Sequence, residues 1–272
     1  MALNSAPRII FITGTDTGVG KTLLTALLLS HLRQQGCRAL AMKPFCSGSE
    51  VGLTDVDILY RFQDHELATH EINPFFFPEP LAPLVAARRH RLRITLDDVL
   101  ERIRAVINQR LVPIQNPKSK VQNSQNSVLL IEGAGGLLAP LGEGFNLLDL
   151  IAAIKDQGSS IQHPASSTQH PAPTIHTFIV ARNQLGTINH TLLTVHALQR
   201  RFAQSPQLSF AVVLMNPSRS DPSTSSNPKI LTELLAPIPV RSIPFLGKNP
   251  LAQNFFKTDL KKLAKTLNRI IG

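Results

Sequence analysis

The fold of this chain is decided by the stretch Gly14-Thr15-Asp16-Thr17-Gly18-Val19-Gly20-Lys21-Thr22. It follows an apolar run with the character of a buried strand, Arg8–Thr13, and it opens a stretch with the periodicity of a helix, Lys21–Gln35. Glycines at such a junction let the backbone curl, so that successive N–H groups point at phosphate oxygens. The sequence therefore predicts a phosphate-binding loop and a site for a nucleoside triphosphate.

The spacing of this loop departs in one place from the common pattern G-x4-G-K-[ST]. Thr15 stands where that pattern has its first glycine, and Gly14 lies one step earlier. We expect the Lys21 side chain to reach the β- and γ-phosphates and the Thr22 hydroxyl to ligate Mg²⁺. The residues expected around the phosphates are Gly18, Val19, Gly20, Lys21, Thr22 and Leu23.

Strand-like and helix-like stretches alternate along the chain, which is typical of β-α units around a parallel sheet. The predicted strands are Arg8–Thr13, Arg38–Lys43, Val128–Glu132, Thr174–Ala181, Ser209–Met215 and Val240–Pro244. The predicted helices are Lys21–Gln35, Leu96–Leu111, Leu147–Lys155, Ile188–Ala203, Lys229–Leu235 and Leu260–Ile271, the second preceded by a capping-box pattern, Thr95 with Asp98. Together with the loop they predict an α/β fold, a three-layer P-loop NTPase with a mainly parallel central sheet flanked by helices.

The composition of the 272 residues fits one globular domain, since 43% are hydrophobic and 17% are charged. Two tracts, at about 113–127 and 158–173, are rich in Ser, Gln and other polar residues, so we expect flexible surface insertions there. No apolar run reaches the roughly 18 residues that a membrane span needs, and the chain has only two cysteines. These features predict a cytoplasmic protein that binds no membrane.

The net charge of +10 comes from 28 Lys and Arg against 18 Asp and Glu. Such an excess suits a nucleic-acid binder, a membrane-surface protein or a site for anionic substrates, and a basic surface without a specific partner produces it as well. The densest basic cluster, Arg88 to Arg93, has no interleaved aromatic residues, and the chain contains one Tyr and no Trp. Because platforms for base stacking are lacking in the sequence, we expect no nucleic acid among the partners.

Charged residues follow two further predicted strands, at the edge where parallel strands deliver side chains to a ligand. Lys43 ends the second strand, and its position alone supports a phosphate contact and a solvated lysine equally. Glu132 follows the apolar run Val128–Ile131 and precedes Gly133-Ala134-Gly135-Gly136, where glycines allow a ligand to approach closely. Asp57 stands among apolar neighbours and is either a metal ligand or part of the polar face of a helix.

Taken in order, six motifs make the chain resemble the dethiobiotin synthetase family of the biotin pathway. The matching segments are Thr15-Asp16-Thr17-Gly18-Val19-Gly20-Lys21-Thr22, Lys43-Pro44 with Ser47-Gly48-Ser49-Glu50, Ile131-Glu132-Gly133-Ala134-Gly135-Gly136, Leu185-Gly186-Thr187-Ile188-Asn189-His190, Asn216, and Ile243-Pro244-Phe245-Leu246. Each motif is loose by itself, but their order along nearly the whole chain outside the two polar tracts is specific.

The resemblance implies an ATP- and Mg²⁺-dependent enzyme that closes a ureido ring on 7,8-diaminopelargonate (7,8-diaminononanoate) with CO₂ and releases dethiobiotin, ADP and phosphate. A carbamate formed on one amine attacks the γ-phosphate, and the second amine then closes the ring. Because two anions meet in this reaction, fixed positive charge is needed, and Lys21, Lys43 and Mg²⁺ would supply it. The resemblance also implies a homodimer with the active site at the subunit interface.

The resemblance assigns roles to residues in four groups. The catalytic residues are Lys43, Lys21 and Thr17, and the Mg²⁺ ligands are Thr22, Asp57 and Glu132. Ser47 is expected to contact the substrate, and a helix start in the second subunit is expected to bind its carboxylate through Thr187, Ile188 and Asn189. The remaining nucleotide contacts are expected from Gly133, Ala134, Gly135, Asn216, Pro217, Pro244, Phe245 and Leu246.

Some positions depart from the family pattern, and a second class of protein fits part of it. Gln184 stands where the resemblance leads us to expect a lysine nearer Gly186, and Gly18 replaces an acidic residue found in some family members. The alternative is a partitioning or cell-division ATPase, which shares this loop variant and architecture and uses nucleotide as a switch. We favour the synthetase, because Asp16 occupies the position of the switch proteins' signature lysine.

Overall fold

A computed structural model describes residues 7–48, 53–111, 127–156, 174–205, 208–248, 250–251 and 253–271 of the chain. These ranges contain every predicted site residue. The two predicted insertions lie outside the described residues, except that Ser127 is the buried first residue of a strand and not part of an insertion. Ser49 and Glu50, which belong to one of the motifs, also lie outside the described residues.

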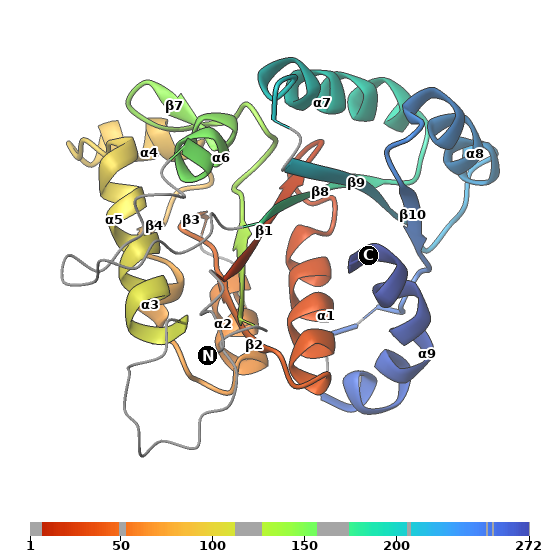
Figure 1. Cartoon of the computed structure of the whole chain (residues 1–272), viewed down its shortest axis with the longest axis horizontal. Coiled ribbons are helices and arrows are strands. Elements are labelled where there is room, and N and C mark those ends of the chain that lie inside the picture. The colour runs from red at the N-terminus through yellow and green to blue at the C-terminus, as the bar shows by residue number, and fades with distance from the viewer. Residues whose placement is uncertain are drawn as a thin grey trace, which may run out of the picture.

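Six parallel strands form the central sheet, in the order β10-β9-β8-β1-β5-β2 (Figure 1). They are β1 (Arg8–Gly14), β2 (Arg38–Met42), β5 (Ser127–Glu132), β8 (Ile175–Arg182), β9 (Leu208–Met215) and β10 (Val240–Ile243). Each coincides with a predicted apolar run, and β1 and β5 are almost completely buried, as strands covered by helices on both faces must be. The predicted α/β fold with a parallel sheet is confirmed.

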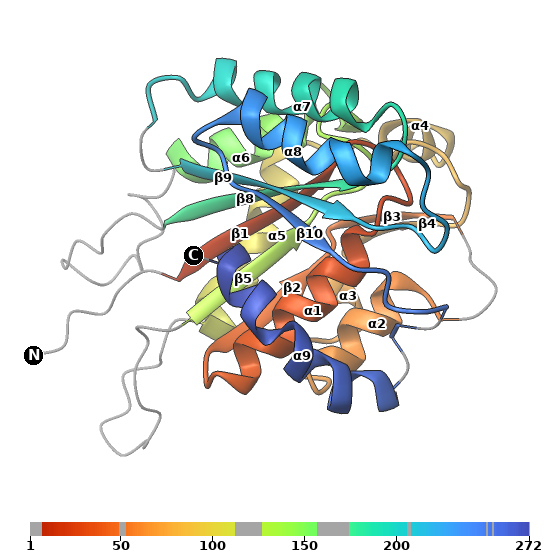
Figure 2. The ribbon, with the colours of Figure 1, turned by 90° about the vertical axis from the view of Figure 1, so that its right-hand side faces the viewer.

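Helices cover both faces of the sheet (Figure 2). One face carries α1 (Lys21–Gln34) and α9 (Gln253–Ile271), with α2 (Asp55–Phe62) packed against α1. The other face carries α6 (Leu147–Asp156), α7 (Thr187–Arg201) and α8 (Ser223–Leu235). The three predicted layers are therefore present.

Two helices begin earlier than the sequence predicts. The helix predicted from Lys229 begins at Ser223, and the one predicted from Leu260 begins at Gln253. In α8 the added turns are mostly small and polar, so they lack the apolar periodicity on which the prediction depended. In the part of the chain that the structure describes, no helix is both long and apolar enough to cross a membrane.

Smaller elements gather on the left side of the molecule in Figure 1. They are β3 (Phe45–Ser47), α3 (Thr69–Ile72), β4 (Phe75–Phe77), α4 (Pro83–Arg89), α5 (Leu96–Val106), a π-helical turn η1 (Ile107–Leu111), β6 (Pro140–Gly142) and β7 (Phe145–Asn146). β3 and β4 pair in parallel, whereas β6 and β7 pair antiparallel. The predicted capping box of Thr95 and Asp98 is confirmed at the start of α5.

The register of the sheet brings the carboxyl ends of four strands together. Gly14 of β1 is opposite Val180 of β8, and on the other side of β1 the register runs to Glu132 of β5. Met42, the last residue of β2, is opposite Ile131 of β5. The residues that follow these strand ends therefore meet at one edge of the sheet, although they are far apart in the sequence.

Candidate functional site

The loop between β1 and α1 has the backbone conformation that its glycines allow. Gly18 and Gly20 have φ values of 65° and 103°, and a Cβ at Gly20 would lie 3.1 Å from the Met215 side chain. A larger residue would therefore be strained at either position. The Nζ atom of Lys21 donates to the carbonyl oxygen of Asp16 over 2.9 Å, so the loop closes around this lysine.

Lys21 is only 7% exposed, and no described carboxylate lies within ion-pair distance of its Nζ. Burial lowers the pKa of Lys21 to about 8, and the nearby charge of Glu132 opposes this shift only in part. A buried cation that is so poorly compensated gains much from an anionic ligand, which replaces the hydration it has lost. The electrostatics of the loop thus favour a bound phosphate.

Lys43 and Glu132 form a buried ion pair where β2 and β5 end. Lys43 Nζ lies 2.9 Å from Glu132 Oε1 and also donates to Oδ2 of Asp55, at the start of α2. Burial opposes the charge on Lys43, but the carboxylates of Glu132 and Asp55 outweigh it and raise the pKa of this lysine. Of the two interpretations that the sequence left open for Lys43, the solvated lysine is excluded, because its side chain is buried.

Two threonines of α1 complete the hydrogen bonding of Glu132. Thr22 Oγ1 donates to Glu132 Oε1 over 2.7 Å, and Thr25 Oγ1 donates to Oε2 over 2.8 Å. The structure therefore brings Thr22 and Glu132 together, as predicted for two ligands of one metal ion. Sequence reasoning missed Thr25, although its position three residues after Thr22 places both on one face of the helix.

Asp55, and not Asp57, is the aspartate of α2 that reaches this cluster. The Asp57 carboxylate accepts hydrogen bonds from the backbone N and the hydroxyl of Thr54, over 3.0 and 2.7 Å, and these bonds lower the pKa of Asp57. Asp57 is thus occupied as the third residue of a capping box, and its expected position beside Thr22 and Glu132 is corrected to Asp55. The pattern Thr-x-x-Asp at 54–57 is the signal that would have separated the two aspartates.

A cavity of about 350 Å³ opens between the loop, α1 and the ends of β2, β3 and β5, and we call it the phosphate cavity. The predicted site residues that line it are Thr17, Gly18, Gly20, Lys21, Thr22, Leu23, Lys43, Ser47, Glu132, Ala134 and Gly135. Asp55 lines it as well. The residue predicted to contact the substrate, Ser47, therefore shares one cavity with both lysines.

Gly133 and Gly135, which follow β5, have different structural roles. Gly133 donates from its backbone N to the Ile12 carbonyl over 2.9 Å, and a Cβ at this position would lie 2.4 Å from the Leu147 side chain. Its small size thus serves the packing of α6, and it does not line the phosphate cavity. Gly135, with φ 69°, does line it, and a Cβ there would lie 3.9 Å from the Thr17 side chain.

The residues predicted to contact the nucleotide base lie at neighbouring strand ends. The backbone N of Asn216 donates to the Ile243 carbonyl over 3.0 Å, which places Asn216 next to Pro244. Met215, the residue before Asn216, packs beside Gly20 of the loop. Asn216, Pro217, Pro244, Phe245 and Leu246 therefore lie together on the β9–β10 side of the loop, outside the phosphate cavity.

The start of α7 adjoins the loop on its β8 side. Thr187, Thr17, Val19 and Arg182 share a small hollow of about 90 Å³ there. The backbone N of Thr187 donates to the Gln184 carbonyl over 3.2 Å, so this predicted N–H donor already has a partner. Ile188 and Asn189 follow in the first turn, where a helix leaves N–H groups without intrahelical acceptors.

Sequence reasoning missed a contact between β8 and the phosphate loop. The guanidinium of Arg182 donates to the carbonyl oxygen of Gly18 over 2.6 Å, and a Cβ on Gly18 would lie 3.4 Å from it. An arginine therefore stands beside the position where some members of the resembled family carry an acidic residue. The only sequence signal was a basic residue directly after an apolar strand.

The donor atoms beside the loop fit Mg²⁺ by their chemistry. The hydroxyl of Thr22 and the carboxylates of Glu132 and Asp55 are oxygen ligands, which Mg²⁺ prefers. The described residues contain no group of three or more His, Cys, Asp and Glu that could hold a metal ion by themselves. Mg²⁺ commonly uses one or two carboxylates together with water and substrate phosphates, so the oxygens of Thr22, Glu132 and Asp55 fit what this ion takes from a protein.

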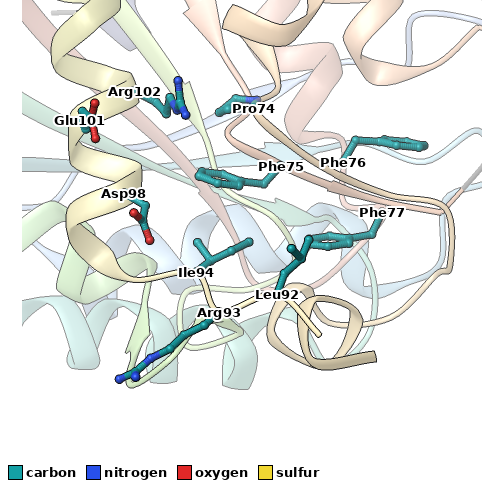
Figure 3. A pocket seen from close by; sticks show the side chains of 10 residues that line it. All are labelled: Pro74, Phe75, Phe76, Phe77, Leu92, Arg93, Ile94, Asp98, Glu101 and Arg102. Atoms are coloured by element: carbon teal, nitrogen blue, oxygen red, sulfur yellow. The ribbon is translucent and has the colours of Figure 1, made fainter. Parts of the chain in front are cut away.

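A second cavity, of about 280 Å³, lies between β4 and the start of α5, and we call it the phenylalanine cavity (Figure 3). Phe75, Phe77, Leu92 and Ile94 point into it, while Phe76 projects to the other side of β4 and is 52% exposed. The Phe75 ring stacks on Phe45, with centroids 5.0 Å apart, and Phe45 lines the phosphate cavity. One pair of rings thus forms the wall between the two cavities.

The closed loop, the lysine buried behind it and the parallel sheet define a P-loop NTPase. Residues 8–156 match the family described as AAA domain. The fold resembles that of the MinC:MinD cell division complex of Aquifex aeolicus (TM-score 0.52, 14% identity, 97% of this chain and 96% of that chain). It also resembles a putative plasmid partition protein of Borrelia burgdorferi bound to AMPPNP (TM-score 0.53, 10% identity, 98% of each chain). At these identities the likeness shows the fold alone.

Relatives in sequence identify the family within the P-loop NTPases to which the chain belongs. The chain is 32% identical to the ATP-dependent dethiobiotin synthetase BioD of Anaeromyxobacter sp. (strain Fw109-5), over 93% of this chain and 97% of the relative. It is 30% identical to the protein of the same name from Bacillus subtilis (strain 168), over 95% of this chain and 94% of the relative. The chain therefore belongs to the dethiobiotin synthetase family, and the resemblance found in its motifs is confirmed.

Proposed function

We propose that this protein is an ATP-dependent dethiobiotin synthetase, a ligase of biotin biosynthesis that converts 7,8-diaminopelargonate, CO₂ and ATP into dethiobiotin, ADP and phosphate. The observation that carries the proposal is the phosphate cavity itself. It holds Lys21 of the loop, the Lys43–Glu132 pair and Ser47 of β3 within one space. A nucleotide switch needs the loop, but it has no need of a second substrate beside the γ-phosphate.

In the proposed reaction, one amine of the substrate adds to CO₂ and loses a proton, which gives a carbamate. A carbamate oxygen attacks the γ-phosphorus, and the bond from that phosphorus to the ADP oxygen breaks. The second amine then attacks the carbamoyl carbon and loses a proton as phosphate leaves, which closes the ring. Thr17 and Ser47 are proposed to hydrogen-bond the substrate or its carbamate, since both line the phosphate cavity.

Positive charge is the main contribution of the protein to this reaction. Lys43 remains protonated because Glu132 and Asp55 hold its charge, so it can face the anionic carbamate throughout the reaction. Lys21 is proposed to bind the β- and γ-phosphates. Mg²⁺, when bound by Thr22, Glu132 and Asp55, would neutralise further charge on the triphosphate.

The base of ATP is proposed to bind at the ends of β9 and β10. Asn216 and Pro217 would contact it from one strand end, and Pro244, Phe245 and Leu246 would cover it from the other. Phe245 supports this role, because its large apolar side chain is 47% exposed. A base packed there would reduce this exposure.

The substrate carboxylate is proposed to bind at the start of α7 of a second subunit, through Thr187, Ile188 and Asn189. Two observations support a homodimer on this side. Leu185, directly before α7, is 82% exposed, and Leu193 in the second turn of α7 is 62% exposed. Exposed leucines beside a helix start that adjoins the phosphate loop are suited to an interface.

Mixing two inactive variants tests the shared site. Lys21→Ala damages the phosphate loop, and Ile188→Pro removes an N–H donor at the start of α7 while a proline is tolerated in a first helical turn. If each active site combines the two elements from different subunits, a mixed dimer contains one intact site and activity returns. If both elements act within one subunit, the mixture remains inactive.

The assay for the proposed function measures ADP release by the purified protein and identifies the product by mass. We expect release that depends on both diaminopelargonate and bicarbonate and that does not respond to DNA. Turnover stimulated by DNA alone would instead support a partitioning ATPase. We also propose that the protein is a single domain that acts in the cytoplasm. Its partners are small-molecule substrates, and it binds neither nucleic acid nor membrane.

A further inference from the structure

Three asparagines behind the base side of the site are linked side chain to side chain. Asn227 of α8 donates from Nδ2 to Asn183 Oδ1 over 3.0 Å, and Asn183, directly after β8, donates from Nδ2 to Asn216 Oδ1 over 2.9 Å. Asn183 and Asn227 are only 1% and 2% exposed. Both polar atoms of the buried Asn183 amide are hydrogen-bonded, so this amide is held rigidly, because rotation would leave polar groups without partners.

Backbone carbonyls fix the direction of two of the three amides, those of Asn227 and Asn183. Asn227 Nδ2 also donates to the carbonyl of Gln184 over 3.1 Å, and Asn183 Nδ2 also donates to the carbonyl of Thr224 over 3.0 Å. A carbonyl oxygen only accepts hydrogen bonds, so neither amide can turn its oxygen to that side. The N–H₂ group of Asn183 therefore donates to Asn216, and the side-chain oxygen of Asn216 accepts this hydrogen bond.

The direction of the Asn216 Nδ2 group follows from this hydrogen bond. Its Oδ1 faces Asn183, so its Nδ2 points away from the network, and no described residue accepts a hydrogen bond from that nitrogen. Asn216 stands at the end of β9, one residue after Met215, which packs beside Gly20 of the phosphate loop. A donor of fixed direction is thus held at the place proposed above for the base of ATP.

We propose that Asn183, held by Asn227, is a positioning residue that makes Asn216 selective for adenine. The inference rests on the proposed role of Asn216 in base binding. An asparagine amide reads adenine through two bonds, donating to N7 and accepting from the N6 amino group. Guanine has an oxygen in place of that amino group, which would face the Asn216 oxygen. An amide free to rotate would adapt to other bases, whereas the fixed one cannot.

The test compares dissociation constants for ATP, 7-deaza-ATP and GTP by titration calorimetry. 7-Deaza-ATP has a carbon in place of N7, so it removes the proposed acceptor and little else. We expect the wild-type protein to bind it about tenfold more weakly than ATP, the effect of one hydrogen bond from an oriented amide. In Asn183→Leu, ATP should bind about tenfold more weakly while 7-deaza-ATP is unaffected, so that their ratio falls to near one. The preference for ATP over GTP should fall with it.

Asn268→Leu is the matched control. Asn268 accepts hydrogen bonds from His31 and Gln35, between α9 and α1, so the same chemical change is made away from the base. In Asn268→Leu, the dissociation constant for 7-deaza-ATP should remain about ten times that for ATP, as in the wild type. If Asn183→Leu does not fold, Asn227→Ala replaces it, because the loss of that donor frees Asn183 to rotate, and the ratio should fall to about three.

Two results would overturn the proposal. One is a folded Asn183→Leu or Asn227→Ala protein that keeps the wild-type ratio. The other is a wild-type ratio near one, which would mean that no donor reads N7. Because binding is measured without diaminopelargonate, failure of the synthetase assay would leave this result intact. The two proposals therefore fail separately.

Discussion

The phosphate cavity and the phenylalanine cavity have similar volumes, about 350 and 280 Å³, but they are built in opposite ways. The first is lined by buried charges from the ends of strands that are distant in sequence. The second is lined mainly by apolar side chains of β4 and of the segment before α5, with charged residues of α5 at its rim. The chemistry of the lining residues, and not the volume of the cavity, therefore distinguishes the candidate functional site.

The linings of the two cavities also contribute differently to the stability of the fold. Burial of ionic groups such as Lys43 and Glu132 is often neutral or unfavourable for stability compared with apolar residues of similar volume. Burial of Phe75 against Phe45 stabilises the fold directly, through apolar area and ring stacking. We therefore expect substitutions in the phosphate cavity to lower activity most. Substitutions around the phenylalanine cavity should lower stability or leave both activity and stability unchanged.

Lys43→Gln should give the largest effect on catalysis. A positive charge that acts mainly in the transition state changes kcat more than nucleotide affinity, and we expect a loss of about 1000-fold in kcat with ATP affinity nearly unchanged. The variant also leaves Glu132 without its cation, at a cost of about 3 kcal/mol in the free energy of unfolding. Steady-state kinetics, calorimetry and chemical denaturation measure the three quantities. An equal fall of affinity and rate would make Lys43 a ground-state phosphate ligand.

Asp55→Asn and Asp57→Asn separate the two aspartates of α2. We expect Asp55→Asn to lower kcat about 100-fold, because its carboxylate contacts Lys43 in the cavity. Asp57→Asn should stay within about twofold of wild-type activity and lose about 1 kcal/mol of stability, since its carboxylate caps a helix. The reverse pattern in the kinetics would restore the original assignment of Asp57.

ATP binding should weaken above pH 8, because Lys21 loses its proton there in the free protein. With one proton required for binding, the dissociation constant should rise about fivefold between pH 8 and pH 9. Lys21→Met should bind ATP weakly at both values and show no such change. A pH-independent affinity in the wild-type protein would mean that Lys21 is not the titrating phosphate ligand.

The same pKa shift predicts the sign of an effect on stability. Below pH 8 both the folded and the unfolded chain hold the Lys21 proton, and between pH 8 and 10.5 only the unfolded chain holds it. The free energy of unfolding should therefore rise with pH in this window, relative to Lys21→Met. At pH 7, Lys21→Met should be more stable than the wild type by about 1–3 kcal/mol, measured by denaturation without nucleotide.

Phe76→Ser should have the smallest effect. The Phe76 ring is about half exposed and lies away from the wall between the cavities, so activity should stay within about twofold and stability within about 0.5 kcal/mol. Phe75→Ala is its control, because it removes the ring that stacks on Phe45 and should cost about 2 kcal/mol. A large loss of activity in Phe76→Ser would show that the exposed side of β4, where this ring lies, takes part in function.

The sequence predicted what depends on local patterns. The apolar runs identified the six strands, and the glycine–lysine stretch identified the loop, because burial and backbone freedom leave direct traces in residue types. It did not predict β3 or β4, which are only three residues long and are held by their pairing with each other. Short elements of this kind depend on tertiary contacts that no periodic pattern records.

The site was predictable in its main residues and less so in its partners. Lys21, Lys43 and Glu132 follow strands, so the topology of a parallel sheet was enough to expect them together. The choice between Asp55 and Asp57 depended on a helix cap, and the link between Arg182 and Gly18 depended on which strand lies beside β1. Strand order is a property of the whole fold, and the sequence pattern does not contain it.

The place of β1 in the sheet has a consequence for how the protein is made. β1 is synthesised well before its two neighbours in the sheet, β5 and β8. Until then its edges lack partners, and such an apolar strand is open to wrong pairing or to capture by chaperones. The proposed site for ATP is complete only after the chain has passed Leu246, the last residue expected to cover the base. Bound nucleotide would therefore stabilise only chains that include this segment and would give no help to shorter ones.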